Sequence, residues 1–326
     1  MKDELGRTVG EAMAWGRKTL SNVSNHAARD ASLLLAHVLK ENPESPYLHP
    51  EAPLDSNTAL TYFDFIQRRA RGEPVAYIRG FQEFMGLKFA VDKRVLIPRP
   101  ETEILVEEIL AFLRRGRVGE RANGHSDDSP NTGLRFGGDS PAIADIGCGS
   151  GAIGLSVARN CPGATVILTD TSREALQVAR DNAVSLGLLE GGPGRPSSRD
   201  GLWERVSFLQ GNLLEPLVLG KVRNLDVVAS NPPYIAAEEM HSLPQEVRRE
   251  PRLALDGGEG GLLYITQLIA GSGPFLRPGG MLIFEVDDGQ ASAVTEMLKG
   301  SGWEDPKILP DLAGYNRVAR GFKPEA

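Results

Sequence analysis

The chain has little cysteine and no long hydrophobic run. Cys148 and Cys161 are the two cysteines among 326 residues, and no cysteine and histidine residues have zinc-site spacing. Two cysteines cannot build a disulfide framework, so we expect a reducing, cytoplasmic environment and no bound metal. No stretch approaches the roughly 18 apolar residues of a membrane span. The N-terminal stretch MKDELGRTVGEAMAWGRK carries early acids and lacks an apolar core, so we expect neither a secretory signal nor a transit peptide.

An excess of basic charge is also absent. The chain has 36 lysines and arginines against 43 aspartates and glutamates, which gives a formal net charge of −7. A protein that binds nucleic acid mainly through its phosphates needs a basic face. We therefore expect no direct contact with nucleic acid, and a protein or a small molecule as the substrate.

The first part of the chain reads as helical. Apolar periodicity predicts helices over Ala27–Lys40 and Ser56–Gly72. The segment Val75–Ile97 is rich in aromatic and β-branched residues around Gly80 and Gly86, which indicates a short hairpin. We therefore expect a helical domain at 1–80, a hairpin linker at 81–97 and a larger domain at 98–326.

From Pro98 onward, strand-like runs alternate with helical ones. Strands are predicted at AIADI, ATVILTD, VSFLQ, LDVVAS and MLIFEV, with helices near residues 101–115, 151–160, 172–187, 260–270 and 291–299. Two stretches rich in Gly, Pro and polar residues, 116–141 and 187–202, indicate flexible insertions. The alternation predicts an α/β fold whose mostly parallel, doubly wound sheet carries helices on both faces.

A glycine-rich loop follows the first strand of this domain. The stretch DIGCGSGAIG spans residues 145–154, and its glycines at 147, 149 and 151 allow a tight turn and close approach of a ligand. The loop also satisfies G-x-G-x-x-G, and Asp170 ends the next strand, where an acid can accept hydrogen bonds from a ribose diol. NAD and S-adenosylmethionine both carry such a diol. The pattern therefore indicates a nucleoside site without deciding between them.

The stretch SNPPYI at residues 230–235 ends a buried strand with two prolines. A rigid turn is the plain interpretation. In a doubly wound sheet, however, Asn231 would emerge beside the glycine loop. A planar NH2 group is a poor nucleophile, because its lone pair is delocalised. The Asn231 side-chain oxygen and the Pro232 carbonyl can accept its two N–H bonds and favour pyramidalisation, while the Tyr234 ring packs against the group. This chemistry favours a methyltransferase over a dehydrogenase.

Four further segments carry a resemblance to a known family: VLIPRPETE at 95–103, EPRLALDGGEGGL at 250–262, DLAGYNRVARG at 311–321 and RGEPVAYIRG at 71–80. Together with the two motifs above, they resemble the PrmC/HemK protein-(glutamine-N5) methyltransferases, which modify the GGQ glutamine of class I peptide-chain release factors. The resemblance implies S-adenosylmethionine as cofactor and a release factor as protein partner. It also implies a Rossmann-like class I methyltransferase domain with a seven-stranded sheet, and an N-terminal helical domain that docks the substrate.

Carried over by position, the resemblance implies two sets of site residues. The cofactor set is Gly147, Cys148, Gly149, Ser150, Gly151, Asp170 at the ribose, Asn212 and Leu213 at the adenine, and Asn231. The catalytic set is Asn231, Pro232, Pro233 and Tyr234. The chain departs from the family pattern at Asn212, where an acid is commoner, at Cys148, where threonine is frequent, and in EVDDGQ at 285–290, where Glu-x-Gly-x-x-Gln is usual.

Other functions and candidate residues remain open at this stage. The nearest alternative is a nucleic-acid adenine N6 or cytosine N4 amino-methyltransferase, followed by a binding protein without turnover and a dehydrogenase. Glu101 and Glu103 open a helix, where acids favour the macrodipole, or lie at the cofactor mouth. We expect the five histidines on the surface or in the core: His26, His37, His49, His125 and His241. We expect a cluster of arginines on a solvated face: Arg248, Arg249 and Arg252.

Overall fold

The computed structural model describes residues 8–119, 140–189 and 205–325. The chain divides into two compact units. The first comprises Met1–Gln82, Val91–Lys93 and Leu243–Glu250, and the second comprises Glu83–Ala90, Arg94–Ser242 and Pro251–Ala326. Residues 120–139 and 190–202, which make up most of the two expected insertions, lie outside the described residues.

The first unit is helical. Its helices are α1 (Val9–Leu20), α2 (Ala27–Leu39), α3 (Ser45–Leu48), α4 (Ser56–Ala70) and α5 (Val75–Arg79). The hydroxyl of Tyr62, at the centre of its apolar core, donates to the Ala31 carbonyl at 3.2 Å. The buried Arg69 guanidinium pairs with Asp30 at 2.7 Å, which satisfies two charges that would otherwise be costly to bury.

The hairpin is shorter than the sequence indicates. The expected extended segment began at Val75, but Val75–Arg79 forms α5, and only β1 (Phe81–Phe84) and β2 (Leu87–Ala90) pair as strands. Pro74 occupies the N-cap of α5 with a φ of −59°, and Gly80 ends the helix at a φ of 76°. A proline before the first turn and a left-handed glycine after the last are helix boundaries, and here they outweigh the β propensity of the residues between them.

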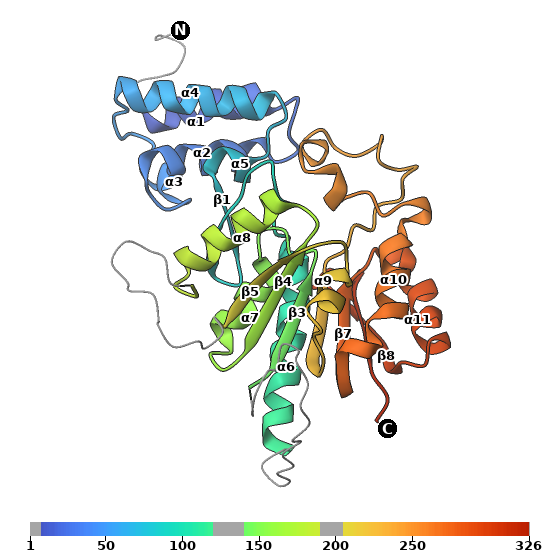
Figure 1. The fold of residues 1–326 in the computed structure, drawn as a ribbon. Helices are drawn as coiled ribbons and strands as arrows, with labels where there is room; N and C mark the ends of the chain where they lie inside the picture. Colours follow the sequence, from blue (N-terminus) through green and yellow to red (C-terminus); the bar gives the residue numbers. More distant parts are fainter. Residues whose placement is uncertain (1–7, 120–139, 190–204, 326) are drawn as a thin grey trace. The chain divides into compact units, whose positions relative to one another are not determined.

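The second unit is an α/β domain built on one sheet. Its helices and strands are α6 (Glu103–Gly119), β3 (Ala142–Ile146), α7 (Ala152–Asn160), β4 (Thr165–Asp170), α8 (Arg173–Ser185), β5 (Val206–Gln210), α9 (Glu215–Leu219), β6 (Leu225–Ser230), α10 (Leu263–Gly271), β7 (Leu276–Glu285), α11 (Ala291–Gly300), β8 (Glu304–Pro310) and β9 (Asn316–Phe322). The order across the sheet is β5-β4-β3-β6-β7-β9-β8, with β9 antiparallel to both of its neighbours (Figure 1). The expected doubly wound, mostly parallel, seven-stranded sheet is confirmed.

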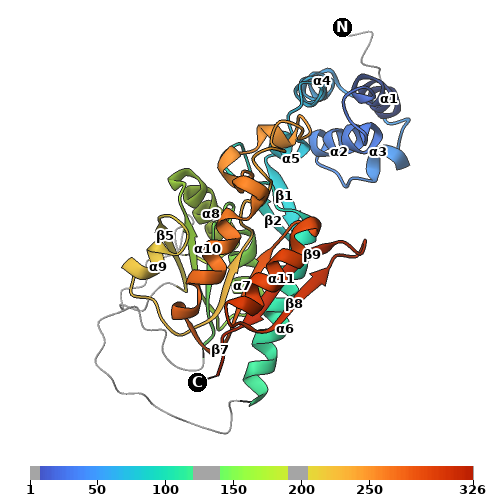
Figure 2. The ribbon, with the colours of Figure 1, turned by 90° about the vertical axis from the view of Figure 1, so that its right-hand side faces the viewer.

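Both faces of this sheet are buried. All five residues of β3 are buried, and alternate side chains enter opposite cores. Ile143 packs in the core that contains residues of α6, α7 and α8, whereas Ala142 and Ala144 pack in the core that contains residues of α9, α10 and α11 (Figures 1 and 2). A parallel strand covered by helices on both faces explains the unbroken apolar run AIADI, in which Asp145 is the exception.

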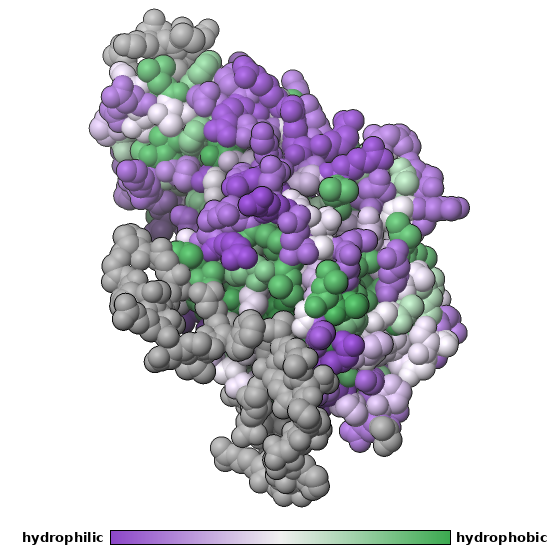
Figure 3. All heavy atoms as spheres, viewed as in Figure 1, coloured by the Kyte–Doolittle hydropathy of each residue, from purple (hydrophilic) through white to green (hydrophobic). Residues whose placement is uncertain are grey.

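The second unit exposes some hydrophobic surface. Figure 3 shows hydrophobic side chains over α9, where Val218 and Leu219 are 57% and 74% exposed. Within the described ranges, no helix combines the length and apolar character needed to cross a lipid bilayer. The same ranges contain no cluster of three or more His, Cys, Asp or Glu side chains able to hold a metal ion.

Candidate active site

The glycine loop lies at the carboxyl end of β3, an interior strand between β4 and β6. Gly147, Gly149 and Gly151 have φ values of 70°, 54° and 81°, in the left-handed region that favours glycine. A Cβ on Gly151 would lie 2.8 Å from a Leu155 methyl group, so this glycine is also required by packing. A Cβ on Gly147 or Gly149 would meet no atom of the described residues within 4 Å. The backbone at these two positions is therefore open to a ligand.

Asp170 is bonded to the glycine loop. Its Oδ2 accepts the Gly149 N–H at 2.9 Å and its Oδ1 accepts the Ser172 N–H at 2.8 Å. Burial raises the pKa of Asp170, against the lowering effect of these backbone bonds. Each carboxylate oxygen has two lone pairs, so the half-buried side chain keeps the capacity to accept hydrogen bonds from the hydroxyls of a ribose.

Asn182 braces the other side of the loop. This buried residue of α8 donates from Nδ2 to the Ser150 carbonyl at 2.9 Å. Its side chain also bonds both backbone groups of Ala90 in the β hairpin, accepting the N–H at 2.7 Å and donating to the carbonyl at 3.1 Å. One carboxamide thus connects α8, the hairpin and the glycine loop.

Asp145 lies beneath the loop and was not among the predicted site residues. The side chain is fully buried, and its Oδ2 accepts the Gly154 N–H at 2.8 Å. Its Oδ1 has no hydrogen-bond partner among the described residues. Burial raises the pKa of Asp145 to about 7, and the charge of Asp170 adds to the effect. An acid two positions before a G-x-G-x-G stretch is the sequence signal that marks this position.

The raised pKa of Asp145 gives a pH-dependent stability with a defined sign. Between pH 3.8 and about 7 the folded chain keeps a proton that the unfolded chain has lost, so this group lowers the free energy of unfolding as the pH rises. Asp145→Asn keeps an acceptor for Gly154 and cannot ionise. We expect it to raise the Tm, relative to the parent protein, more at pH 8 than at pH 5.

Thermal unfolding followed by circular dichroism at the two pH values measures this difference. Asp181→Asn, at an exposed position of α8, is the matched control and should show no such trend. An equal change in Tm at pH 5 and pH 8 for Asp145→Asn would contradict the assignment.

The residues expected at the adenine follow β5. Gln210, the last residue of β5, pairs with Asp170, so Asn212 and Leu213 emerge at the same edge of the sheet as the glycine loop. Asn212 is exposed. Leu213 is half-buried, has a φ of 45° and packs against the core that contains residues of α9, α10 and α11. A leucine in the left-handed region is uncommon, and such strain is frequent at ligand sites.

The strand register brings the two sequence motifs together. Ile146 of β3 pairs with Ser230 of β6, so the next residues, Gly147 and Asn231, leave adjacent strands at the same edge. The Ser230 hydroxyl donates to the Ile146 carbonyl at 2.7 Å and fixes this junction. The order of strands therefore places Asn231 beside the glycine loop, as the sequence indicates.

Two buried side chains that the sequence analysis missed hold the ends of the Asn-Pro-Pro-Tyr motif. Asn231 donates from Nδ2 to the Thr102 hydroxyl at 3.3 Å, and the Tyr234 hydroxyl donates to Glu285 Oε1 at 2.9 Å. Thr102 in turn donates to Glu285 Oε2 at 2.5 Å. Pro232 is buried between these anchors. Because the Tyr234 hydroxyl is engaged and its pKa is raised by burial, the ring is the part of Tyr234 that remains for contact with a substrate.

The glycines of DGGEGG allow a second chain segment to approach the motif closely. The Gly257 N–H donates to the Ile235 carbonyl at 2.8 Å, and a Cβ on Gly257 would lie 2.7 Å from the Pro233 carbonyl oxygen. A Cβ on Gly261 would lie 2.1 Å from the Tyr234 carbonyl oxygen, which also accepts from Gln290 Nε2 at 2.9 Å. This segment therefore fixes the path of the backbone on the far side of the two prolines.

The structure also shows the surroundings of the remaining candidates. Cys148 is buried, and burial raises the pKa of its thiol well above the ordinary value, so it is no reactive thiolate. Glu103 accepts the Met85 N–H at 2.6 Å and supports the hairpin turn, whereas Glu101 is exposed. His37 stacks on Phe65 in the first unit. Other residues of these groups are exposed, namely His26, His49, His241, Arg248, Arg249 and Arg252, while His125 lies outside the described residues.

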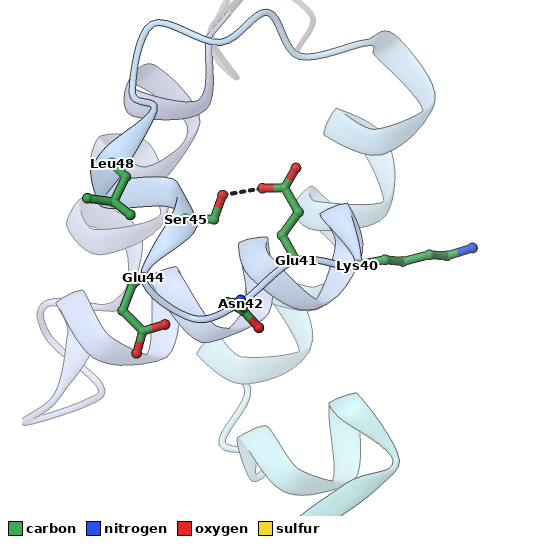
Figure 4. A pocket seen from close by; sticks show the side chains of 6 residues that line it. All are labelled: Lys40, Glu41, Asn42, Glu44, Ser45 and Leu48. Atoms are coloured by element: carbon green, nitrogen blue, oxygen red, sulfur yellow. Dashed lines mark hydrogen bonds between the residues drawn. The ribbon is translucent and has the colours of Figure 1, made fainter.

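A pocket of about 470 Å³ belongs to the first unit and contains none of the predicted site residues. It lies between the end of α2 and α3, and the Ser45 hydroxyl donates to the Glu41 carboxylate across it (Figure 4). Its polar lining has no motif that the sequence analysis singled out. We therefore place the candidate site at the edge of the sheet and not in this pocket.

Comparison with known proteins decides the family. Residues 11–80 match the PrmC N-terminal domain, and residues 137–267 match the methyltransferase small domain. A release factor glutamine methyltransferase of Moorella thermoacetica is 39% identical over 322 residues, which is 98% of this chain and 99% of that protein. Those of Chlorobaculum tepidum and Burkholderia pseudomallei are 38% and 37% identical, over 90% and 91% of this chain and 88% and 92% of theirs. The chain belongs to the release factor glutamine methyltransferase family.

Solved structures agree with the family at the level of the fold. The hMettl16 catalytic domain in complex with hairpin 1 of the MAT2A 3'UTR has a TM-score of 0.53 at 13% identity, covering 89% of this chain and 90% of that one. At this identity the likeness concerns the methyltransferase fold alone. The segment EVDDGQ differs from the usual pattern of the release factor glutamine methyltransferase family, but its glutamine, Gln290, still makes a hydrogen bond at the site. Asp287 caps the turn by accepting the Gly289 N–H, and Gln290 still reaches the Tyr234 carbonyl.

Proposed function

We propose that this protein transfers a methyl group from S-adenosylmethionine to the side-chain amide nitrogen N5 of the GGQ glutamine in a class I peptide-chain release factor. The observation that carries the proposal is the orientation of the Asn231 side-chain amide. Its Nδ2 donates a hydrogen bond to Thr102, so its Oδ1 is left to accept a hydrogen bond beside the glycine loop. Family membership supports the choice of a protein glutamine over a nucleic-acid base, and the net charge of −7 agrees with it.

The residues around the glycine loop fit the proposed cofactor. Gly147 and Gly149 leave the space that a Cβ would fill, and Asp145 has a buried oxygen without a partner beneath them. Asp170 would accept the ribose hydroxyls, and Asn212 and Leu213 would flank the adenine. S-adenosylmethionine supplies a methyl group bonded to a positively charged sulfur. The sulfur is a good leaving group, because it departs as a neutral thioether. A cation near Asp145 would favour the ionised form of this buried acid.

The Asn-Pro-Pro-Tyr motif would hold the glutamine. Asn231 Oδ1 and the Pro232 carbonyl would each accept one N–H of the amide, which orients the nitrogen and weakens the delocalisation of its lone pair. The two prolines fix the backbone that carries these acceptors, so little reorganisation is needed during the reaction. The Tyr234 ring would pack against the flat amide. Positioning supplies most of the rate, because the transfer needs no covalent help from the protein.

The first unit would bind the protein substrate. Residues 11–80 match a domain characteristic of this family, and the larger unit contains every residue to which we assign a role in methyl transfer. We therefore assign docking of the release factor to the helical unit, and we expect the protein to act in the cytoplasm, where translation terminates.

Methyl transfer to a release factor tests the proposal directly. The protein is incubated with isotopically labelled S-adenosylmethionine and a class I release factor, and tryptic peptides are analysed by mass spectrometry. We expect a gain of one methyl group on the GGQ glutamine, and none when that glutamine is replaced by alanine. Parallel reactions with DNA and RNA should remain unlabelled. Labelling of a nucleic acid and not of the release factor would establish the amino-methyltransferase alternative instead.

A further inference from the structure

The orientation of the Asn231 carboxamide decides what this side chain can do. Its oxygen and nitrogen occupy equivalent positions, so a rotation of half a turn about the terminal bond exchanges an acceptor for a donor. To accept a hydrogen bond from a substrate NH2 group, Asn231 must present Oδ1 and turn Nδ2 away. In the structure Nδ2 donates to Thr102 Oγ1 at 3.3 Å, so Thr102 determines which end faces outward.

Thr102 can only accept from Asn231, because its single hydroxyl proton is already used. That proton is donated to Glu285 Oε2 at 2.5 Å. Both residues are buried, with 3% and 1% of their surfaces exposed, so water does not compete for these bonds. With the proton committed to the carboxylate, the lone pairs of Oγ1 face Asn231, and only the NH2 end of the carboxamide can bond to them.

Glu285 also holds the other end of the motif. Its second oxygen accepts the Tyr234 hydroxyl at 2.9 Å. A flipped Asn231 would require Thr102 to turn its proton towards Oδ1, which would leave Glu285 Oε2 without a donor. A buried oxygen that loses its hydrogen-bond donor is strongly disfavoured. The carboxylate therefore enforces one orientation of Asn231 and one position of Tyr234 together.

We propose that Thr102 and Glu285 are positioning residues that hold Asn231 with its side-chain oxygen towards the substrate amide. The identity of that amide as a glutamine rests on the function proposed above, but the orientation of Asn231 does not. Neither residue needs to touch the substrate. Both act through Asn231 and Tyr234. Thr102 is the last residue of the 3-10 helix η1 (Pro100–Thr102), and Glu285 is the last residue of β7.

Three substitutions separate this role from simple packing. Thr102→Val keeps the shape and removes the acceptor, and Thr102→Ser keeps the hydroxyl. Glu285→Gln replaces one of the two carboxylate acceptors by an NH2 group, so either Thr102 or Tyr234 loses its acceptor. With the NH2 group against Thr102, the threonine proton is freed for Asn231 Oδ1, which favours the flipped carboxamide. We expect Thr102→Val and Glu285→Gln to lower kcat by about 10- to 100-fold, because a misplaced acceptor loses its transition-state contact. The KM for the release factor and the Kd for S-adenosylmethionine should change less than about threefold.

Matched controls come from α11. Thr295 donates to the Ala291 carbonyl within this helix, and Glu296 is an exposed acid on it, so Thr295→Val and Glu296→Gln make the same chemical changes away from the site. Both should leave kcat unchanged, and Thr102→Ser should restore it to within about threefold of the parent. A Thr102→Val protein with near-normal kcat would overturn the proposal. So would parallel losses of kcat, cofactor affinity and Tm, which would indicate a structural role only.

A spectroscopic measurement tests the orientation without any turnover. In protein labelled with ¹⁵N-asparagine, the side-chain amide of Asn231 is assigned by its absence in Asn231→Ser. We expect slow exchange of its Thr102-bonded proton with water in the parent and in Thr102→Ser, and faster exchange in Thr102→Val and Glu285→Gln. Exchange that is equal in all four proteins would refute the assignment. A parent protein that shows this exchange pattern but does not methylate a release factor would reject the proposed function and retain the positioning role.

Discussion

Asn231→Ala is expected to lower kcat by about 10²- to 10³-fold, the effect typical of losing one preorganised polar contact to a transition state. The Kd for S-adenosylmethionine should change much less, because the glycine loop, Asp170 and Asn182 keep their mutual hydrogen bonds. Single-turnover kinetics with a release factor measures the first quantity, and calorimetric titration with the cofactor measures the second.

The matched control for this substitution is Asn160→Ala. Asn160 ends α7, and its Nδ2 donates to the Ser156 carbonyl within the same helix. We expect its kcat to equal that of the parent. If Asn231→Ala also retained near-normal turnover, Asn231 would have no part in the reaction, and the proposed mechanism would fail.

Gly261→Ala is expected to have the second largest effect, although the residue contacts no substrate. Its added Cβ would lie 2.1 Å from the Tyr234 carbonyl oxygen, and its φ of 71° is unfavourable for alanine. The backbone of the Asn-Pro-Pro-Tyr motif must therefore move. Because a displacement of about 1 Å in a catalytic group can cost about 100-fold in rate, we expect a loss of that order in kcat. Activity assays and a crystal structure of the variant measure both consequences.

Gly300→Ala is the control for that substitution. Gly300 ends α11, and a Cβ there would meet no atom within 4 Å. It should leave both activity and Tm close to those of the parent. A Gly261→Ala protein with an unmoved Tyr234 and full activity would show that the close approach of the DGGEGG segment is unimportant for the site.

The parts of the fold that the sequence predicts are those with a strong local signal. The apolar runs of β3, β4 and β6 identify buried parallel strands, and a serine, Ser172, caps the expected helix α8 by accepting the Ala175 N–H at 3.1 Å. Once these strands are neighbours in a parallel sheet, their carboxyl ends meet. For that reason the proximity of Gly147, Asp170 and Asn231 could be predicted from their places in the chain.

The parts that could not be predicted depend on distant contacts. Thr102 and Glu285 lie 183 residues apart, and nothing in either local sequence indicates that their side chains bond. Strand β8 has a weak signal for another reason. All of its residues are exposed or half-buried, so its sequence EDPKILP lacks the apolar run of a central strand. Its place in the sheet comes from pairing with β9 and not from its composition.

Asn182 has a consequence for the dynamics of the domain. Since one side chain closes hydrogen bonds to the hairpin and to the glycine loop, opening of either segment removes a contact that holds Asn182 in place for the other. We therefore expect the openings of the two segments to be coupled. By thermodynamic reciprocity, whatever stiffens the loop also reduces fraying of the hairpin, and a strained hairpin would weaken any ligand held by the loop.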